Sequence, residues 1–318
     1  MVAQSTMWAV QFRSYGGPEV LEIGAAAVPE PGPKEVVVEV AAFSVNAVDL
    51  QTRRGKMRLF DGMGFPKGSG VDFAGVVRAV GSRVGEVEVG RRVWGYLGMK
   101  PPGRAAAGAQ YVRVRADRVA PAPDAVPLTE AAALPLAGLT AVQALRPLKL
   151  RRGDRVLVVG GNGGVGSTVI QVARIMGGEV DAVVGVRSDA AIGAGARQVF
   201  DYHDLKPSDI PGRYDVVVDT AGTDASAYRR LLKSGGRMTA IAPGAFWDIL
   251  RSMVSPGSVI RMVSGKPSAK DLTWLAAQVN AGELKPLIAA TYPLDRIVEA
   301  HRDAESASAA GKRVVLAR

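Results

Sequence analysis

Four consecutive apolar residues at 156–159 are followed at once by a glycine-rich stretch and then by apolar positions at helical spacing. An unbroken apolar run of this length is typical of a strand that is buried on both faces of a parallel sheet. Behind it, Gly160, Gly163 and Gly166 allow the backbone to turn sharply. Apolar residues at 169, 172, 173 and 176 then follow the period of a helix. The pattern predicts a strand, a tight glycine turn and a helix in direct succession.

Comparable apolar strands recur along the middle of the chain, with helical segments between them. They are residues 156–160, 180–185, 198–201, 215–220, 237–242 and 258–263. Strand–helix alternation with apolar, β-branched strands predicts an α/β fold with a doubly wound parallel sheet. The strand at 258–263 is expected at an edge of this sheet.

The first part of the chain has a different pattern, in which short strands are separated by glycine- and proline-rich turns. The predicted strands include 8–12, 20–23, 36–40, 76–80, 89–95 and 110–114. Several short strands of this kind predict a small β-barrel. Helices are predicted at 129–134, 136–145 and 269–279. A further helix is capped by residues 292–295 and runs through residue 301, and a closing strand is predicted at 312–316. That strand is expected to return to the first domain, because the six-stranded sheet is already complete.

These patterns divide the chain into three segments. We predict a β-rich catalytic domain over 1–126, a dinucleotide-binding domain over 127–264 and a return to the first domain over 265–318. A chain of 318 residues is long enough for two such domains.

Composition narrows the class of protein. Hydrophobic residues at 47% and charged residues at 22% are ordinary for a soluble globular protein. No apolar run has transmembrane length, so no membrane partner is expected. Residues 1–6 lack the basic cluster and apolar core of a secretory signal. The absence of cysteine excludes disulfides, thiol nucleophiles and cysteine-ligated zinc, and it fits a cytoplasmic location.

The net charge of +10 favours phosphorylated ligands or nucleic acid. The basic residues are scattered, however, and the densest group, Arg113, Arg115 and Arg118, alternates with Val112 and Val114. This alternation is typical of the solvated face of a strand. Specific nucleic-acid binding is therefore not expected.

The glycine turn at 160–166 carries the strongest chemical signal. Bare glycine amides and the opening turn of a helix together suit the phosphates of a ligand. The alternative is an ordinary strand-to-helix turn. Because the strand before it, the helix after it and the repeats downstream all agree, we predict a dinucleotide site.

The end of the second strand indicates which dinucleotide. An acidic residue there would favour NAD(H), but Asp181 lies at the wrong end of the strand. Arg187 instead supplies a planar cation suited to a 2′-phosphate, with Ser188 as a small donor. Asp189 is the alternative, since a slight register shift would bring it to the ribose. We predict NADP(H).

Five segments together resemble the medium-chain dehydrogenase/reductase superfamily, in its zinc-free quinone oxidoreductase-like branch. They are residues 44–49 (SVNAVD), 68–75 (GSGVDFAG), 131–140 (AAALPLAGLT), 160–166 (GGNGGVG) and 311–312 (GK). The resemblance covers nearly the whole chain, and it is the order of the set that is specific. It implies a GroES-like β-barrel and a Rossmann domain with the site between them, and a homodimer that pairs through the last strand of the sheet.

The resemblance also implies cofactor-binding positions. The hydroxyl near the nicotinamide, the pyrophosphate-binding amides, the tyrosine beside the 2′-phosphate and the backbone contacts to the carboxamide fall on Thr140, Gly163, Gly164, Val165, Tyr202, Ala242 and Ser264. For Tyr202, an ordinary aromatic at a strand end is the alternative.

Zinc-dependent relatives carry a cysteine where this chain has Asn46, and a His-Glu pair where it has Val71 and Asp72. A catalytic zinc needs three Cys, His or carboxylate ligands and an open position. The two histidines, His203 and His301, are expected in a loop and on a surface helix. We predict no metal.

Without zinc, a saturated ketone lacks a strong Lewis acid, whereas a quinone or an α,β-unsaturated carbonyl delocalises its own charge. Asn46 is the candidate catalytic residue that orients cofactor or substrate; a turn-capping Asn is the alternative. Asp49 is expected to cap a local turn. Some related enoyl reductases carry a tyrosine where this chain has Ala47, so water is expected to supply the proton.

The sequence thus predicts an NADPH-dependent quinone or enone reductase. Two alternatives stay open: a biosynthetic tailoring reductase for a polyketide-like intermediate, and a nucleotide-binding protein with a structural or RNA-associated role. Tyr96 and Phe60 are candidates either for lining the site or for the core.

Overall fold

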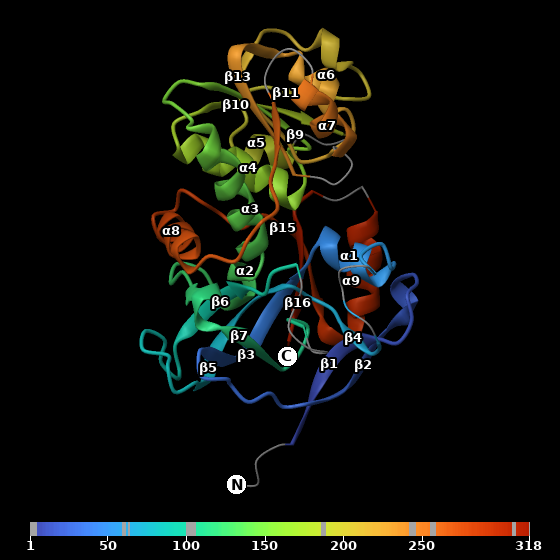
Figure 1. Ribbon diagram of the computed structural model, residues 1–318, viewed down its shortest axis with the longest axis vertical. Coiled ribbons are helices and arrows are strands. Elements are labelled where there is room, and N and C mark those ends of the chain that lie inside the picture. Colours follow the sequence, from blue (N-terminus) through green and yellow to red (C-terminus); the bar gives the residue numbers. More distant parts are fainter. Residues whose placement is uncertain are drawn as a thin grey trace. The chain divides into compact units, whose positions relative to one another are not determined.

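A computed structural model describes residues 5–58, 62, 64–99, 106–185, 189–241, 246–254, 259–306 and 310–317 (Figure 1). The chain forms two compact units. The first comprises Met1–Leu136, Lys266–Gly282 and Ile288–Arg318, and the second comprises Ala137–Gly265 and Glu283–Leu287. No helix among the described residues is long and apolar enough to cross a bilayer.

The first unit is built on two sheets. One has the order β2-β1-β4, and the other has the order β15-β16-β3-β5-β6-β8, with β7 also paired to β3. The strands are β1 (Thr6–Phe12), β2 (Leu21–Ala27), β3 (Glu35–Val45), β4 (Lys67–Gly68), β5 (Asp72–Val80), β6 (Arg92–Tyr96), β7 (Tyr111–Arg115), β8 (Val119–Pro121), β15 (Ile288–Pro293) and β16 (Lys312–Leu316). The closing strand β16 pairs with β3, which confirms its predicted return to this part of the fold.

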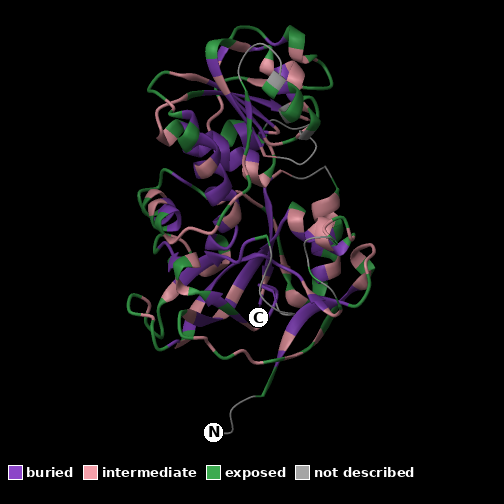
Figure 2. Ribbon diagram, viewed as in Figure 1, coloured by how far each residue is buried: buried purple, intermediate pink, exposed green. Residues whose placement is uncertain are grey.

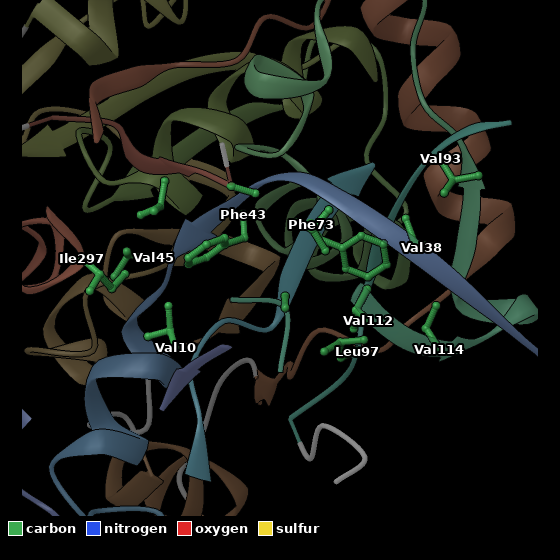
Figure 3. Packing of buried hydrophobic residues seen from close by; sticks show 14 of the residues in the cluster. Val10, Val38, Phe43, Val45, Phe73, Val93, Leu97, Val112, Val114 and Ile297 are labelled. Atoms are coloured by element: carbon green, nitrogen blue, oxygen red, sulfur yellow. The ribbon is translucent and has the colours of Figure 1, made fainter. Parts of the chain in front are cut away.

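The long strand β3 organises the larger sheet. It pairs with β5 on one side, while β7 and β16 share its other side. Phe43 of β3 and Phe73 of β5 lie in the core between the strands (Figure 3) and are fully buried. Along β7, Val112 and Val114 point inward while Arg113 and Arg115 are exposed, as the alternation predicted. Arg118 lies beyond the strand instead, where it donates to the Leu97 carbonyl.

Among the described residues of the first unit, the α-helices are α1 (Ala47–Arg53), α2 (Leu128–Ala131), α8 (Ala269–Asn280) and α9 (Ile297–Glu305). The unit extends to Leu136, beyond the expected boundary at 126, and the Leu136 amide donates to Asp72 Oδ2 at 3.2 Å. Residues 283–287 belong to the second unit, where both backbone polar groups of Lys285 bond the side-chain amide of Gln171.

The second unit is a six-stranded parallel sheet in the order β11-β10-β9-β12-β13-β14. Its strands are β9 (Arg155–Val159), β10 (Glu179–Val184), β11 (Val199–Asp201), β12 (Tyr214–Asp219), β13 (Leu232–Ala240) and β14 (Ile260–Met262). This is the 3-2-1-4-5-6 order of the doubly wound dinucleotide-binding fold, so the predicted fold class is confirmed. The central strands are almost wholly buried (Figure 2).

The helices of this unit are α3 (Pro135–Leu145), which begins at its boundary, α4 (Gly164–Ile175), α5 (Asp189–Gly193), α6 (Ala225–Arg229) and α7 (Phe246–Val254). Strand β14 lies at an edge of the sheet, as predicted, although it is shorter than the expected 258–263. The reversal of strand order falls beside β9, and ligands of open α/β sheets bind at such a point.

Candidate active site

The glycine turn forms the connection between β9 and α4. Gly160 has a φ of +83°, a left-handed conformation that favours glycine. The amides of Gly160 and Gly161 donate to Val183 O of the neighbouring strand at 2.9 and 3.0 Å. Gly163 is the N-cap of α4. The turn is therefore tied to β10 before the helix begins.

Steric room explains why glycines occupy this turn. A Cβ on Gly166 would lie 2.0 Å from Gly160 O, so α4 packs against the turn only without a side chain there. A Cβ on Gly163 would find its nearest neighbour at 3.5 Å. Gly166 therefore serves close packing, whereas the space at Gly163 stays open to a ligand.

The backbone groups of the turn define where an anion fits. The Gly163 amide donates to Gly160 O at 3.1 Å, so it is used within the turn rather than offered to a ligand. The amides of Gly164, Val165 and Gly166 lie in the first turn of a helix, whose amides lack intrahelical acceptors. Together with the helix dipole they suit a pyrophosphate. Gly164 and Val165 remain cofactor candidates, while Gly163 contributes open space.

The carboxyl ends of the next strands carry the candidates for cofactor preference. Asp181 lies within β10 rather than at its carboxyl end, and its carboxylate lies 3.0 Å from Arg155 Nη2 and 3.1 Å from Tyr214 Oη. Tyr202 directly follows β11 and is 57% exposed. Arg187 and Ser188 lie outside the described residues. Asp189 begins α5.

The remaining candidate residues of this unit differ in how far they are buried. Thr140 is buried within α3. Ser264 follows β14 and is exposed, and Ala242 lies outside the described residues. The structure thus places the turn and Tyr202 at the carboxyl edge of the sheet, because β9 and β11, which carry them, both pair in parallel with β10.

Asn46 belongs to a buried polar network of the first unit. Its Nδ2 donates to Asp72 Oδ1 at 2.9 Å and to Ser44 O at 3.1 Å, and its Oδ1 accepts from Lys312 Nζ. Ser44 Oγ also donates to Asp72 Oδ1, at 2.7 Å. A flipped amide would face ammonium with NH₂ and carboxylate with oxygen, so the two neighbours set its orientation.

Asn46 is the N-cap residue of α1, and Asp49 in the first turn completes the capping box, in agreement with its expected capping role. One carboxylate oxygen accepts from the Asn46 amide at 2.9 Å and the other accepts from the Gly70 amide at 3.0 Å. Burial, followed by the charge of Asp72, raises the pKa of Asp49 to about 7 against these hydrogen bonds. Burial also lowers the pKa of Lys312, while Asp72 and Asp49 oppose that change. One ammonium thus balances two buried carboxylates.

The sequence reasoning missed the roles of Lys312, Asp72 and Ser44. Lys312 was noted only as part of a motif, although a charged residue at the start of an apolar strand calls for a buried partner. Tyr96 belongs to the core, since it is fully buried and burial raises its pKa. Its hydroxyl has no hydrogen-bond partner among the residues that the structure describes. Phe60 lies outside that set.

The two histidines have different environments. His203 is exposed in a turn, as expected. The prediction for His301 was wrong, because it is fully buried in α9, with its Nε2 3.3 Å from Ser69 Oγ. Ile297, Ala300 and His301 form the inward face of that helix. Within the described part of the chain, no three His, Asp or Glu residues are grouped so as to hold a metal ion.

Two family models match the chain. The alcohol dehydrogenase GroES-like domain matches residues 32–124, and the zinc-binding dehydrogenase model matches residues 194–315. The 2-methylene-furan-3-one reductase of Solanum lycopersicum is 32% identical over 98% of this chain and 79% of its own length. The chloroplastic NADPH-dependent alkenal/one oxidoreductase of Arabidopsis thaliana is 32% identical over 96% of this chain and 78% of its own length.

A solved structure is similar to this chain over nearly its whole length. The quinone oxidoreductase from Coxiella burnetii is 30% identical, with a TM-score of 0.90 over 98% of this chain and 100% of its own. The likeness includes both units of the fold.

Proposed function

This chain belongs to the medium-chain dehydrogenase/reductase family, in its quinone oxidoreductase-like branch, and from this premise we propose that it is an NADP(H)-dependent reductase of quinones or α,β-unsaturated carbonyls. The observation that carries the proposal is the β9–α4 turn, which leaves open space at Gly163 and places the amides of Gly164 and Val165 in the first turn of α4. A dinucleotide fits this turn, and similar proteins are named for NADPH, alkenal, enone and quinone chemistry.

When bound, NADPH supplies a hydride. The residues of the chain then have to bind its pyrophosphate, hold the reacting carbon in place and accommodate an oxygen that gains negative charge. Gly164 and Val165 bind the pyrophosphate through their amides, and Thr140 contributes a hydroxyl near the nicotinamide. Both amide hydrogens of Asn46 are committed to Asp72 and Ser44 and its oxygen accepts from Lys312, so its proposed orienting role is to shape the site rather than to donate to the substrate. Because residue 47 is alanine, the proton comes from water.

The direction of hydride addition tests the reaction. With NADPH deuterated at the transferred position, we expect an enone to gain deuterium at its β-carbon and solvent hydrogen at its α-carbon. A screen of quinones, enones, enals and simple alcohols should show activity with the conjugated acceptors and little alcohol oxidation. Deuterium on the carbonyl carbon would mean 1,2-reduction and would contradict the proposal.

Cofactor preference is proposed to depend on Arg187, helped by Ser188 and Tyr202. A charge-assisted Arg–phosphate contact contributes about 1.5–3 kcal/mol, so Arg187→Glu should weaken NADPH binding about tenfold or more. NADH binding, which lacks the phosphate contact, should change far less. Equal losses for the two cofactors would remove Arg187 from this role. Ala242 and Ser264 remain proposed backbone contacts to the carboxamide.

Metal independence is proposed from the residue types at the site. The chain has no cysteine, and the side chains of Asn46 and Asp72 are engaged with Ser44 and Lys312. Elemental analysis should find no stoichiometric zinc, and chelators should leave turnover unchanged. One tightly held zinc per chain would refute this part of the proposal.

We also propose a homodimer in the cytoplasm. Strand β14 is the last strand at its edge of the described sheet, a position at which two copies can associate, although the Ile260 amide already donates to Ser252 Oγ at 3.0 Å. Trp247, Leu250 and Met253 of α7, with Val259 and Met262 beside the edge, are all exposed. An apolar group of this kind supports pairing of two copies at this edge.

A further inference from the structure

Tyr202 is held by two contacts that the proposed function does not use. A Cβ on Gly185 would lie 2.9 Å from Tyr202 Cε1 and 3.0 Å from its hydroxyl oxygen, so the phenol lies directly over that glycine. The rings of Tyr202 and His203 are 4.1 Å apart at their centroids, with an interplanar angle of 32°. An exposed tyrosine is ordinarily free to change rotamer, whereas the Tyr202 ring packs against Gly185 and against the ring of His203.

His203 is itself anchored. Asp201, the last residue of β11, accepts from the His203 backbone amide at 2.8 Å, and its Oδ1 lies 2.8 Å from His203 Nδ1. These bonds hold the pKa of Asp201 below its usual range, with the bond from the His203 backbone as the largest cause. The Asp201 charge is thereby directed at His203. Asp201, Tyr202 and His203 thus form a single braced turn.

The turn at residues 201–203 lies beside the glycine turn that connects β9 to α4. Val183 O accepts from the amides of Gly160 and Gly161, and the next carbonyl, Val184 O, accepts from the Tyr202 amide at 3.0 Å. Gly185 follows directly and precedes the segment that contains Arg187. The carboxyl ends of β9, β10 and β11 therefore bring the pyrophosphate turn, Gly185 and Tyr202 together at adjacent positions.

We propose that Gly185 and His203 are specificity-determining positioning residues that hold the Tyr202 hydroxyl for the 2′-phosphate of NADPH. The inference rests on the proposed NADP(H) function and adds two residues to it. Gly185 leaves the space that the phenol occupies, and His203 limits the motion of its ring. A side chain that is ordered before binding loses less entropy when the phosphate arrives. NADH lacks that phosphate, so it gains nothing from the brace.

The experiment measures equilibrium dissociation constants for NADPH and NADH by titration calorimetry, which does not require turnover. His203→Ala removes the brace, and Gly185→Ala displaces the far end of the phenol. Each should raise the NADPH Kd about three- to tenfold, with less than a twofold change for NADH. His203→Phe keeps the ring contact and the backbone bond to Asp201 but loses the Nδ1 contact, so its NADPH Kd should lie between those of the wild-type protein and His203→Ala. Gly193→Ala, whose Cβ would meet nothing within 4 Å, is the matched control and should leave both constants unchanged.

Several outcomes would overturn the inference: equal losses for the two cofactors, an unchanged NADPH Kd in His203→Ala, or an NADPH Kd in His203→Phe no better than that of His203→Ala. The last result, with restoration by His203→Lys, would assign a charge rather than a ring contact to this position. Tight NADPH binding without turnover on any conjugated acceptor would refute the proposed reaction and leave the brace intact. A wild-type protein that does not bind NADPH would refute both the proposed function and the role of Gly185 and His203.

Discussion

At the scale of single residues, burial determines which side chains carry charge. His301 lies buried in α9, where burial and then the nearby Arg53 lower its pKa to about 3. Its Nδ1 has no hydrogen-bond partner among the described residues, so the ring has little to stabilise a second proton. Asp49 shows the opposite case, since burial raises its pKa to about 7. The fold favours the neutral form of both groups, and they couple to pH with opposite signs.

The folding stability should therefore depend on His301 below neutral pH. The unfolded imidazole binds a proton below about pH 6.5 and the folded one does not, so stability is lost as pH falls from 6.5 towards 3. At pH 5 this loss amounts to about 2 kcal/mol. Urea unfolding at pH 5 and pH 7.5 should show a smaller pH effect in His301→Gln than in the wild-type protein.

The comparison between the two proteins isolates the histidine. Asp49 is stabilised in its protonated form by the fold, so its contribution falls as pH rises from about 4 to 7. This contribution is present in both proteins and cancels in the difference. The same pH effect in His301→Gln and the wild-type protein would mean that His301 titrates normally.

At the scale of elements, the β9–α4 connection separates packing from binding. Gly166 allows the helix to approach Gly160 O, while Gly163 leaves open space above the turn. Gly163 also has a φ of −67°, which any residue adopts. Within the same loop, Gly166 is needed for helix packing, whereas Gly163 leaves room for a ligand.

Two alanine variants test that separation. Gly166→Ala places a Cβ against a backbone oxygen, so we expect a loss of about 1–3 kcal/mol in the free energy of unfolding and a lower Tm. Gly163→Ala should keep the wild-type Tm and weaken NADPH binding, because its Cβ enters the space left for the pyrophosphate. Thermal unfolding and NADPH titration measure the two effects. An unchanged Tm in Gly166→Ala would contradict the packing role.

At the scale of the whole molecule, the exposed apolar group on α7 and beside β14 calls for a partner. Trp247, Met253 and Met262 are 74%, 65% and 59% exposed. Burial of such side chains between two copies stabilises a dimer through the hydrophobic effect.

Light scattering at micromolar concentration should give twice the chain mass. Met262→Asp places a charge at this edge and should shift the protein towards the monomer. Ile192→Asp is the matched control, since Ile192 is 55% exposed in the same unit but lies in α5. A monomer mass for the wild-type protein, or equal dissociation by both substitutions, would contradict pairing at β14.

The sequence by itself determined the six parallel strands, the glycine turn and the alternating face of β7. Each is encoded in side chains that are close together along the chain, so the local pattern of residue types identifies it. The spacing of Ile297, Ala300 and His301 also encodes the buried face of α9, and this face, rather than the exposed one, carries His301.

Only the tertiary structure brought Asn46, Asp72 and Lys312 together, because the register of β16 against β3 joins residues 266 positions apart. It also assigned residues 127–136 to the first unit and committed the Gly163 amide to Gly160. Such contacts depend on strand pairing and on competition among hydrogen-bond acceptors. No local pattern encodes either, so the partners of a buried charge are decided when the strands assemble.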